Sequence, residues 1–407
     1  MEARNVNVPM QRLEIDTDYL TQQLKTLLEI PSPTGYTDNV ARYVCGELER
    51  IGIEYDLTRR GAVRGVLPGL ARGGARAIVS HVDTLGAQVK AIKSTGRLEL
   101  VAIGTWSARF AEGARVTLFS EKGTYRGTIL PLKASGHTYG DDVDSQPIGW
   151  EHLELRIDAL GTTPEEIRKL GIDIGDIVAI DPGPEFLDNG FIVSRHLDNK
   201  AGVAVMLAAM KALMDAKKRP PVDVFWLFTI AEEVGHGAAS ILLPDIASMV
   251  AVDNGTSALG QNSSEFGVTV SMADQTGPFD FHLTRKLVEL CQGNEIRYQK
   301  DVFRYYRSDS ASAIEAGADV RTALVTFGVD ASHGYERIHL HALRSLAELL
   351  TAYSVSDVEI PRDRQAVAGL SGFTHQPSEP AAQGAAREQL AAIDQGSGDG
   401  AKKEGDG

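Results

Sequence analysis

Apolar strands alternate with amphipathic helices at both ends of this chain of 407 residues, and a long middle stretch interrupts the alternation. Two helical patterns within residues 17–51 precede strand patterns at Val63–Leu67 and Ala77–Ser80. After residue 196 the alternation resumes, with helices expected at Ala201–Met214, Phe279–Cys291 and His339–Tyr353 and strands at Val222–Ile230 and Met249–Asp253. Because strands that alternate with helices form mostly parallel sheets, we expect an α/β fold with helices on both faces.

The middle stretch has short strands of alternating polarity, separated by Gly-rich turns. Candidate strands are Arg97–Ala102, Arg115–Leu118, Thr124–Ile129 and Ile177–Asp181. This pattern is typical of a small β-barrel or sandwich. We therefore expect an α/β domain made of residues 1–87 and 190–360, interrupted by an inserted β-barrel at residues 88–189. Residues 361–407 are rich in Ala, Gln, Gly and Ser, lack the apolar density that offsets ordering entropy, and are expected to form a disordered tail.

The composition excludes some classes of partner. A formal net charge of −14 argues against a nucleic-acid or anionic-membrane surface, because both need clusters of Lys and Arg. The two cysteines, Cys45 and Cys291, are too few for a disulfide framework. The first residues lack an apolar signal-peptide core, and apolar runs such as Val222–Ala231 are far shorter than a membrane span. These features favour a soluble, cytoplasmic protein.

Acidic and histidine side chains gather where predicted strands end or meet helices. The set comprises, in chain order, His81 and Asp83, Asp198, the pair Glu232–Glu233, Asp253, and His333 in a loop before a helix. Each alone has an ordinary structural explanation, as a polar strand end, a helix N-cap or a loop histidine. Their joint position is more informative, because ligands of open α/β sheets bind outside the carboxyl ends of the strands.

These residue types suit a site for two divalent metal ions. Histidine and carboxylate ligands without cysteine favour Zn²⁺, Co²⁺ or Mn²⁺. Asp83, two residues along the strand from His81, points to the same side and can orient its imidazole. The two oxygens of Asp198 can bridge two ions. Of the Glu232–Glu233 pair, one can bind a metal while the other takes a proton from the attacking water, as in metal-assisted hydrolysis.

The order and spacing of these motifs resemble those of the M42 family of glutamyl-aminopeptidase-like metallopeptidases. The similar runs are His81-Val-Asp83-Thr-Leu-Gly86, His196-Leu-Asp198-Asn-Lys-Ala-Gly202, Ala231-Glu232-Glu233-Val-Gly235, Val252-Asp253 and His333, within residues 17–353. The opening Ile30-Pro-Ser-Pro-Thr-Gly35 also fits. The M20, M28 and M18 families share most metal motifs. In M42 proteins, however, the β domain enters just after the His-x-Asp motif, whereas in M20 proteins the second domain follows the Glu-Glu pair.

The resemblance implies a role for each residue of the set. By analogy, Asp198 bridges two metal ions, Glu232 is the general base and Asp83 supports His81, while the remaining ligands are His81, Glu233, Asp253 and His333. Zinc is the first expectation for the metal, with cobalt or manganese as alternatives. The family also has a cis peptide after the bridging Asp, here Asp198–Asn199. Its members often assemble into tetrahedral dodecamers through the β domain, which implies a dimer-based homo-oligomer.

The chain also departs from the family pattern. Asn199 and Arg307-Ser308-Asp309 stand where many members have a second Asp and a Gly-Gly-Thr-Asp run. Arg304 and Arg307 either contact a substrate carboxylate or form a solvated face. We expect an aminopeptidase acting on peptides. The alternatives are an amidohydrolase or deacylase of N-blocked dipeptides, as in a branch associated with the osmoprotectant N-acetylglutaminylglutamine amide, a non-catalytic binding descendant, and an unrelated α/β protein.

Overall fold

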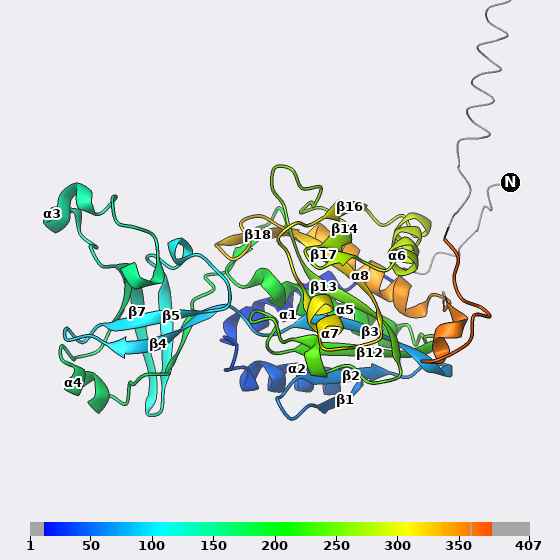
Figure 1. Cartoon of the computed structure of the whole chain (residues 1–407), viewed down its shortest axis with the longest axis horizontal. Coiled ribbons are helices and arrows are strands. Elements are labelled where there is room, and N and C mark those ends of the chain that lie inside the picture. Colours follow the sequence, from blue (N-terminus) through cyan, green and yellow to red (C-terminus); the bar gives the residue numbers. More distant parts are fainter. Residues whose placement is uncertain (1–11, 359, 377–407) are drawn as a thin grey trace, which may run out of the picture. The chain divides into compact units, whose positions relative to one another are not determined.

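The computed structural model describes residues 12–358 and 360–376 (Figure 1). Met1–Val367 form one compact unit and Ala368–Gly407 a second. The described part of the second unit, residues 368–376, consists of turns and bends without a helix or strand. Residues 377–407 of the predicted disordered tail lie outside the described residues.

A mixed sheet forms the centre of the first unit. In the described residues it has nine strands in the order β1-β2-β12-β3-β13-β17-β14-β15, with β16 paired to β14. The bounds are β1 Glu54–Leu57, β2 Val63–Leu67, β3 Ala71–His81, β12 Val222–Thr229, β13 Ile246–Thr256, β14 Val268–Asp274, β15 Gly277–Pro278, β16 Tyr298–Val302 and β17 Arg321–Val329. The central strands β12, β3, β13 and β17 run parallel to their neighbours in that group, which confirms the predicted α/β sheet.

Each face of the sheet carries its own apolar core, because successive strand residues point to opposite faces. In β3, Ile78 belongs to one core cluster, whereas Ala77 and Val79 belong to another. Five helices pack into the first cluster: α1 Thr17–Glu29, α2 Asp38–Ile51, α5 Leu197–Asp215, α6 Phe281–Gly293 and α8 Leu340–Val355. Among the described residues, the helices that contribute to the second cluster are the short α7, Asp309–Glu315, and a 3-10 turn at Ala238–Ser240. The helical cover of the two faces is therefore unequal.

Helix α5 is buried along most of its length and reaches the centre of the molecule. It packs on β3 and β13 and is covered by α1 and α8, which lie beside it in Figure 1. A helix enclosed in this way needs apolar or small residues on all sides, as in the run Ala201–Met210. The N-terminal end of α5 therefore has a fixed position relative to the carboxyl ends of β3 and β13.

The middle of the chain forms a closed six-stranded antiparallel barrel, which confirms the predicted insert. Its strand order is β4-β5-β8-β7-β6-β9. The bounds are β4 Gly86–Ile92, β5 Leu98–Ile103, β6 Arg115–Ser120, β7 Gly123–Pro131, β8 Leu153–Ile157 and β9 Ile177–Ile180, with the short helices α3 Gly136–Tyr139 and α4 Pro164–Lys169 between strands. The barrel has a separate apolar core. The division of the chain at residues 88 and 189 stays a prediction.

The chain returns from the barrel through a small sheet of three strands in the described residues. Its strands are β10 Glu185–Phe186, β11 Phe191–Ser194 and β18 Glu336–His339. Farther on, a 3-10 turn spans Pro361–Arg364, and Asp363 accepts a hydrogen bond from Arg321 Nε at 2.5 Å. This beginning of the expected tail is therefore ordered and belongs to the first unit. Among the described residues, no helix combines the length and apolar character that crossing a bilayer requires.

Candidate metal centre

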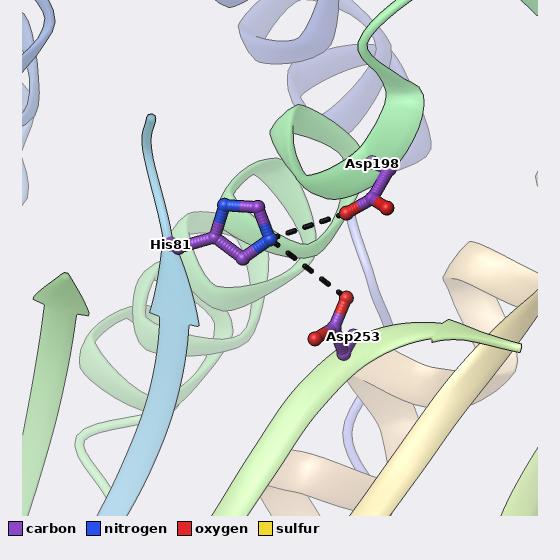
Figure 2. Close-up of side chains that lie close together, drawn as sticks. All are labelled: His81, Asp198 and Asp253. Carbon is purple, nitrogen blue, oxygen red and sulfur yellow. Dashed lines mark hydrogen bonds and ion pairs between the residues drawn. The ribbon is translucent and has the colours of Figure 1, made fainter. Parts of the chain in front are cut away.

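Two groups of side chains that share Asp198 can each hold a metal ion. The first comprises His81, Asp198 and Asp253, whose ligand atoms lie within 4.8 Å of one another. Figure 2 shows the His81 imidazole facing both carboxylates, with Nε2 at 3.1 Å from Asp198 Oδ1 and 3.9 Å from Asp253 Oδ1. All three side chains are buried. Imidazole nitrogen and carboxylate oxygen are common zinc ligands, so this group has suitable chemistry for that ion.

The second group comprises Asp198, Glu233 and His333. His333 Nε2 lies 3.3 Å from Asp198 Oδ2 and 3.9 Å from Glu233 Oε2. Asp198 therefore presents Oδ1 to the first group and Oδ2 to the second. This is the arrangement expected of a carboxylate that bridges two ions.

Both histidines are oriented by backbone carbonyl groups. His81 Nδ1 lies 2.9 Å from the carbonyl oxygen of Asp83, and His333 Nδ1 lies 2.8 Å from that of Thr105. Because a carbonyl oxygen only accepts, each Nδ1 must donate its proton, and in the neutral imidazole Nε2 then carries a lone pair. Each Nε2 faces an Asp198 oxygen, which is also an acceptor. A proton or a cation between the two atoms resolves this contact, as in a metal site.

Two of the three ligands of the first group stand on regular strands. His81 is the last residue of β3, and Asp253 lies inside β13. The prediction that Asp253 ends its strand was wrong, because β13 continues to Thr256 along β17. Asp198 lies at a kink near the start of α5, where its peptide bond to Asn199 is cis, as the family resemblance implied.

The ligands that the second group adds stand on irregular backbone. Strand β12 ends at Thr229, so Glu232 and Glu233 lie in a turn rather than at an extended strand end. Both glutamates line the same cavity. His333 lies in a loop with a left-handed backbone, at φ 65°.

Asp83 connects His81 with the Glu232–Glu233 turn. Its carboxylate accepts the backbone N–H groups of Glu232 at 3.1 Å and Glu233 at 3.4 Å, and the hydroxyl of Thr34 at 2.7 Å. Its carbonyl oxygen, rather than its carboxylate, makes the hydrogen bond with His81, whose Nδ1 lies 3.5 Å from Asp83 Oδ1. Asp83 therefore orients His81 through its backbone carbonyl group and also fixes the turn that carries both glutamates.

Glu232 faces the same centre without belonging to either ligand group. Its Oε2 lies 3.7 Å from His81 Nε2, and it lines a cavity of about 800 Å³ together with Asp198, Glu233, Asp253 and His333. Burial raises the pKa of the Glu232 carboxyl well above its usual value, with Asp253 adding to the effect and His81 opposing it. A carboxyl with a raised pKa, beside the ligand groups and open to a cavity, is suited to proton transfer.

Negative charge is concentrated at this centre. Burial and the charge of Asp198 raise the pKa of Glu233 well above its usual value and that of Asp253 to about 7. Burial alone would lower the pKa of His333, but Asp198 and Glu233 raise it to about 10. One oxygen of Glu233, Oε1, is buried without a hydrogen-bond partner. Crowded carboxylates and an unpaired carboxylate oxygen are features that divalent cations satisfy, so these residues fit a metal centre.

Two further residues at the centre were not singled out from the sequence. Asn254 Nδ2 donates to Asp198 Oδ2 at 2.6 Å, and Glu336 accepts backbone N–H groups of Asp198 and His333. Asn254 directly follows a candidate ligand, which was a usable signal. Glu336 stood in a polar loop-to-strand segment, where nothing in the local pattern distinguishes a buried acceptor from a surface acid.

Four other polar residues of the family motifs and of the Arg307 segment differ in their surroundings. His196 is oriented by the carbonyl oxygen of Ile180 at 3.0 Å, and Lys200 donates to that of Ile30 at 3.2 Å. Arg307 lines the cavity and pairs with Glu315 at 2.6 Å. Arg304 is exposed and is not part of the cavity wall.

Known proteins share both the sequence pattern and the fold. The model of the M42 glutamyl aminopeptidase family matches residues 61–349. The Bacillus subtilis protein YhfE is 37% identical over 331 residues, which cover 81% of this chain and 95% of that protein.

Two solved structures show the same fold. An aminopeptidase from Desulfurococcus kamchatkensis has a TM-score of 0.76 at 24% identity, covering 87% of this chain and 98% of that one. The TET1 peptidase of Pyrococcus horikoshii, which can assemble into a tetrahedron or a large octahedral shell, has a TM-score of 0.72 at 23% identity, covering 82% and 99%. From the family match and the relative from Bacillus subtilis, the chain belongs to the M42 family of aminopeptidases.

Proposed function

We propose that this chain is a dinuclear metal-dependent aminopeptidase in which Asp198 bridges the two ions. His81 and Asp253 complete one ligand group, and Glu233 and His333 complete the other. The observation that carries the proposal is that the two oxygens of Asp198 face different histidines. Oδ1 lies 3.1 Å from His81 Nε2, and Oδ2 lies 3.3 Å from His333 Nε2. Zinc is the proposed metal because imidazole and carboxylate ligands suit it, and cobalt and manganese share this preference.

Two divalent ions bound in these groups would polarise a scissile carbonyl and lower the pKa of an attacking water. Glu232 is the general base. It accepts a proton from that water as the water oxygen adds to the carbonyl carbon, and then delivers the proton to the leaving amine nitrogen. Asp83 holds the backbone of Glu232 in place during both transfers. The cavity of about 800 Å³ has room for a peptide beside these groups.

A substrate screen of the zinc-loaded protein tests the proposed function. Dipeptides with a free amino terminus and the same dipeptides with an acetylated amino terminus are assayed in parallel, with metal content measured on the same samples. We expect about two ions per chain and cleavage of the free dipeptides. Cleavage of only the acetylated series would instead support the amidohydrolase alternative. The association with osmoprotectant dipeptides stays a prediction, and this second series tests it.

Loss of hydrolysis in every arm, with no divalent ion retained, would contradict the proposal and favour a binding descendant. The ligand set argues against that outcome, because both groups and Glu232 are present around one cavity.

We also propose a homo-oligomer, up to a dodecamer, with the barrel contributing to subunit contacts. The support is the shared fold with a peptidase that assembles into closed shells. Light scattering coupled to size exclusion measures the mass directly. A mass of a single chain, about 43.8 kDa, at every concentration tested would contradict this part of the proposal.

A further inference from the structure

Glu336 joins the backbones of two candidate ligands that come from different parts of the chain. It begins β18 and is only 1% exposed. Its Oε1 accepts the backbone N–H of His333 at 2.9 Å, and its Oε2 accepts that of Asp198 at 3.1 Å. One carboxylate therefore connects the start of α5 with the loop that carries His333.

Both backbones that Glu336 holds are irregular. His333 has a left-handed φ of 65°, which is uncommon for a residue other than glycine. Asp198 has φ −73° and ψ 106°, outside the helical range, although it lies within α5. A left-handed conformation such as that of His333 persists when surrounding contacts enforce it, and Glu336 provides a buried contact of this kind.

The contacts of Glu336 are unequal between the two ligand groups. In the second group it holds both Asp198 and His333. In the first group it holds Asp198 alone. The other two ligands, His81 and Asp253, are fixed by strands β3 and β13. A change at Glu336 should therefore affect the second group more than the first.

We propose that Glu336 is a positioning residue that sets the affinity of the second group, Asp198, Glu233 and His333, for its metal ion. This inference rests on the proposed two-metal function. The competing explanation is that Glu336 only caps the start of α5, where backbone N–H groups lack partners within the helix. A cap affects the stability of the whole chain, whereas a positioning residue changes one of two metal affinities.

The test is a zinc titration of the metal-free, full-length protein against a competing chelator, with thermal melting of each sample. Glu336→Gln is nearly isosteric, but its NH₂ group would face one of the two backbone N–H donors. One of the two hydrogen bonds would therefore be lost. Glu348→Gln is the matched control. Glu348 is also a buried glutamate, with 7% of its side chain exposed, and it accepts a hydrogen bond of 3.0 Å from Arg344. It does not line the cavity.

We expect two ions per chain in the wild type and in Glu348→Gln. In Glu336→Gln, one ion should bind with nearly wild-type affinity and the other about 10- to 100-fold more weakly, the range for loss of an outer partner of a metal ligand. Raising the zinc concentration should restore hydrolysis. If Glu336→Gln is recovered unfolded, Glu336→Asp, which keeps the charge but has a shorter side chain, is titrated and judged in the same way.

Unchanged affinities, or an equal loss at both groups, would overturn the positioning role and leave Glu336 as a cap. These results differ from a failure of the proposed function, in which the wild type itself would bind fewer than two ions.

Discussion

Both ligand groups combine one histidine with two carboxylates, but they differ in the backbone that supports them. His81 and Asp253 stand on β3 and β13, whose positions are fixed by parallel pairing over many residues. Glu233 and His333 stand on a turn and a loop, so their positions depend on individual hydrogen bonds. The sheet places His81 and Asp253, whereas Glu233 and His333 need additional supports.

Three contacts support the second group, two of them from distant segments and one from within the His333 loop. Asp83 holds the turn of Glu233, Glu336 holds the loop of His333, and the carbonyl oxygen of Thr105 orients the His333 ring. Thr105 follows the barrel strand β5, so the inserted barrel contributes to this group. One candidate ion site is therefore built mainly by the central sheet, and the other depends on hydrogen bonds to Asp83, Thr105 and Glu336.

Asp198→Asn should have the largest effect, because Asp198 is the only ligand that both groups contain. We expect loss of both ions at micromolar zinc and hydrolysis at background level. Asp253→Asn is the informative comparison, because it removes a ligand from the first group alone and should leave one ion bound. Metal analysis after dialysis distinguishes the two variants. An Asp198→Asn protein that keeps both ions would remove Asp198 from the bridging role.

Glu232→Gln should separate catalysis from metal binding. Because Glu232 belongs to neither ligand group, we expect both ions to remain, while kcat falls about 10²- to 10⁴-fold through loss of the general base. Steady-state kinetics with metal analysis of the same sample measures both effects. A near wild-type rate with full metal content would exclude Glu232 as the base.

Asp83→Asn should have a smaller effect that is shared by the two groups. Its amide would keep one acceptor oxygen but place an NH₂ against an N–H of the Glu232–Glu233 turn, so we expect about a 10- to 100-fold loss in activity or metal affinity. Asp223→Asn is the control. Asp223 is also buried and accepts a backbone N–H, that of Gly69, at 2.7 Å, but it lies outside the cavity wall. Equal activity of Asp83→Asn and this control would argue against the role of Asp83.

The smallest expected effect is a pH dependence of the metal-free protein. Burial raises the pKa of Asp253 to about 7, above its value in an unfolded chain. A carboxyl of this kind contributes stability below its unfolded pKa and loses that contribution as the pH rises through the folded value. His333, whose pKa is raised to about 10, contributes stability that is likewise lost as the pH rises above its unfolded value.

Both groups therefore make the metal-free protein less stable as the pH rises from about 5 to 8. Thermal melting should show a fall of a few degrees over this range in the metal-free protein, and a smaller one in the Asp253→Asn variant. A melting temperature that rises over the same pH range would contradict the raised pKa values of Asp253 and His333.

Much of the fold could be predicted from the sequence, because the main elements have strong local patterns. The two N-terminal helices, the core of α5 and the strand at Val63–Leu67 follow directly from apolar periodicity. The short strands β10, β11 and β18 could not be predicted, because they depend on pairing between segments that are distant in sequence. The same limit applied to the length of β13, which is set by its neighbour β17.

The candidate ligands and Asp83 could also be proposed from the sequence, but the supports from Glu336 and Thr105 could not. His81, Asp198 and the glutamate pair lie at element boundaries, where a polar residue after an apolar run is visible in the sequence. Glu336 acts through backbone N–H groups, which have no sequence signature. The orientation of His333 depends on the carbonyl oxygen of Thr105, and any residue at that position supplies the same group.

The central claim is that Asp198 bridges two metal ions, and anomalous X-ray diffraction from crystals of the zinc-loaded protein tests it most directly. We predict two zinc peaks about 3.5–4 Å apart, with Asp198 Oδ1 at the ion of His81 and Asp253 and Oδ2 at the ion of Glu233 and His333. A single peak in fully loaded crystals, or two ions of which only one contacts Asp198, would contradict the claim.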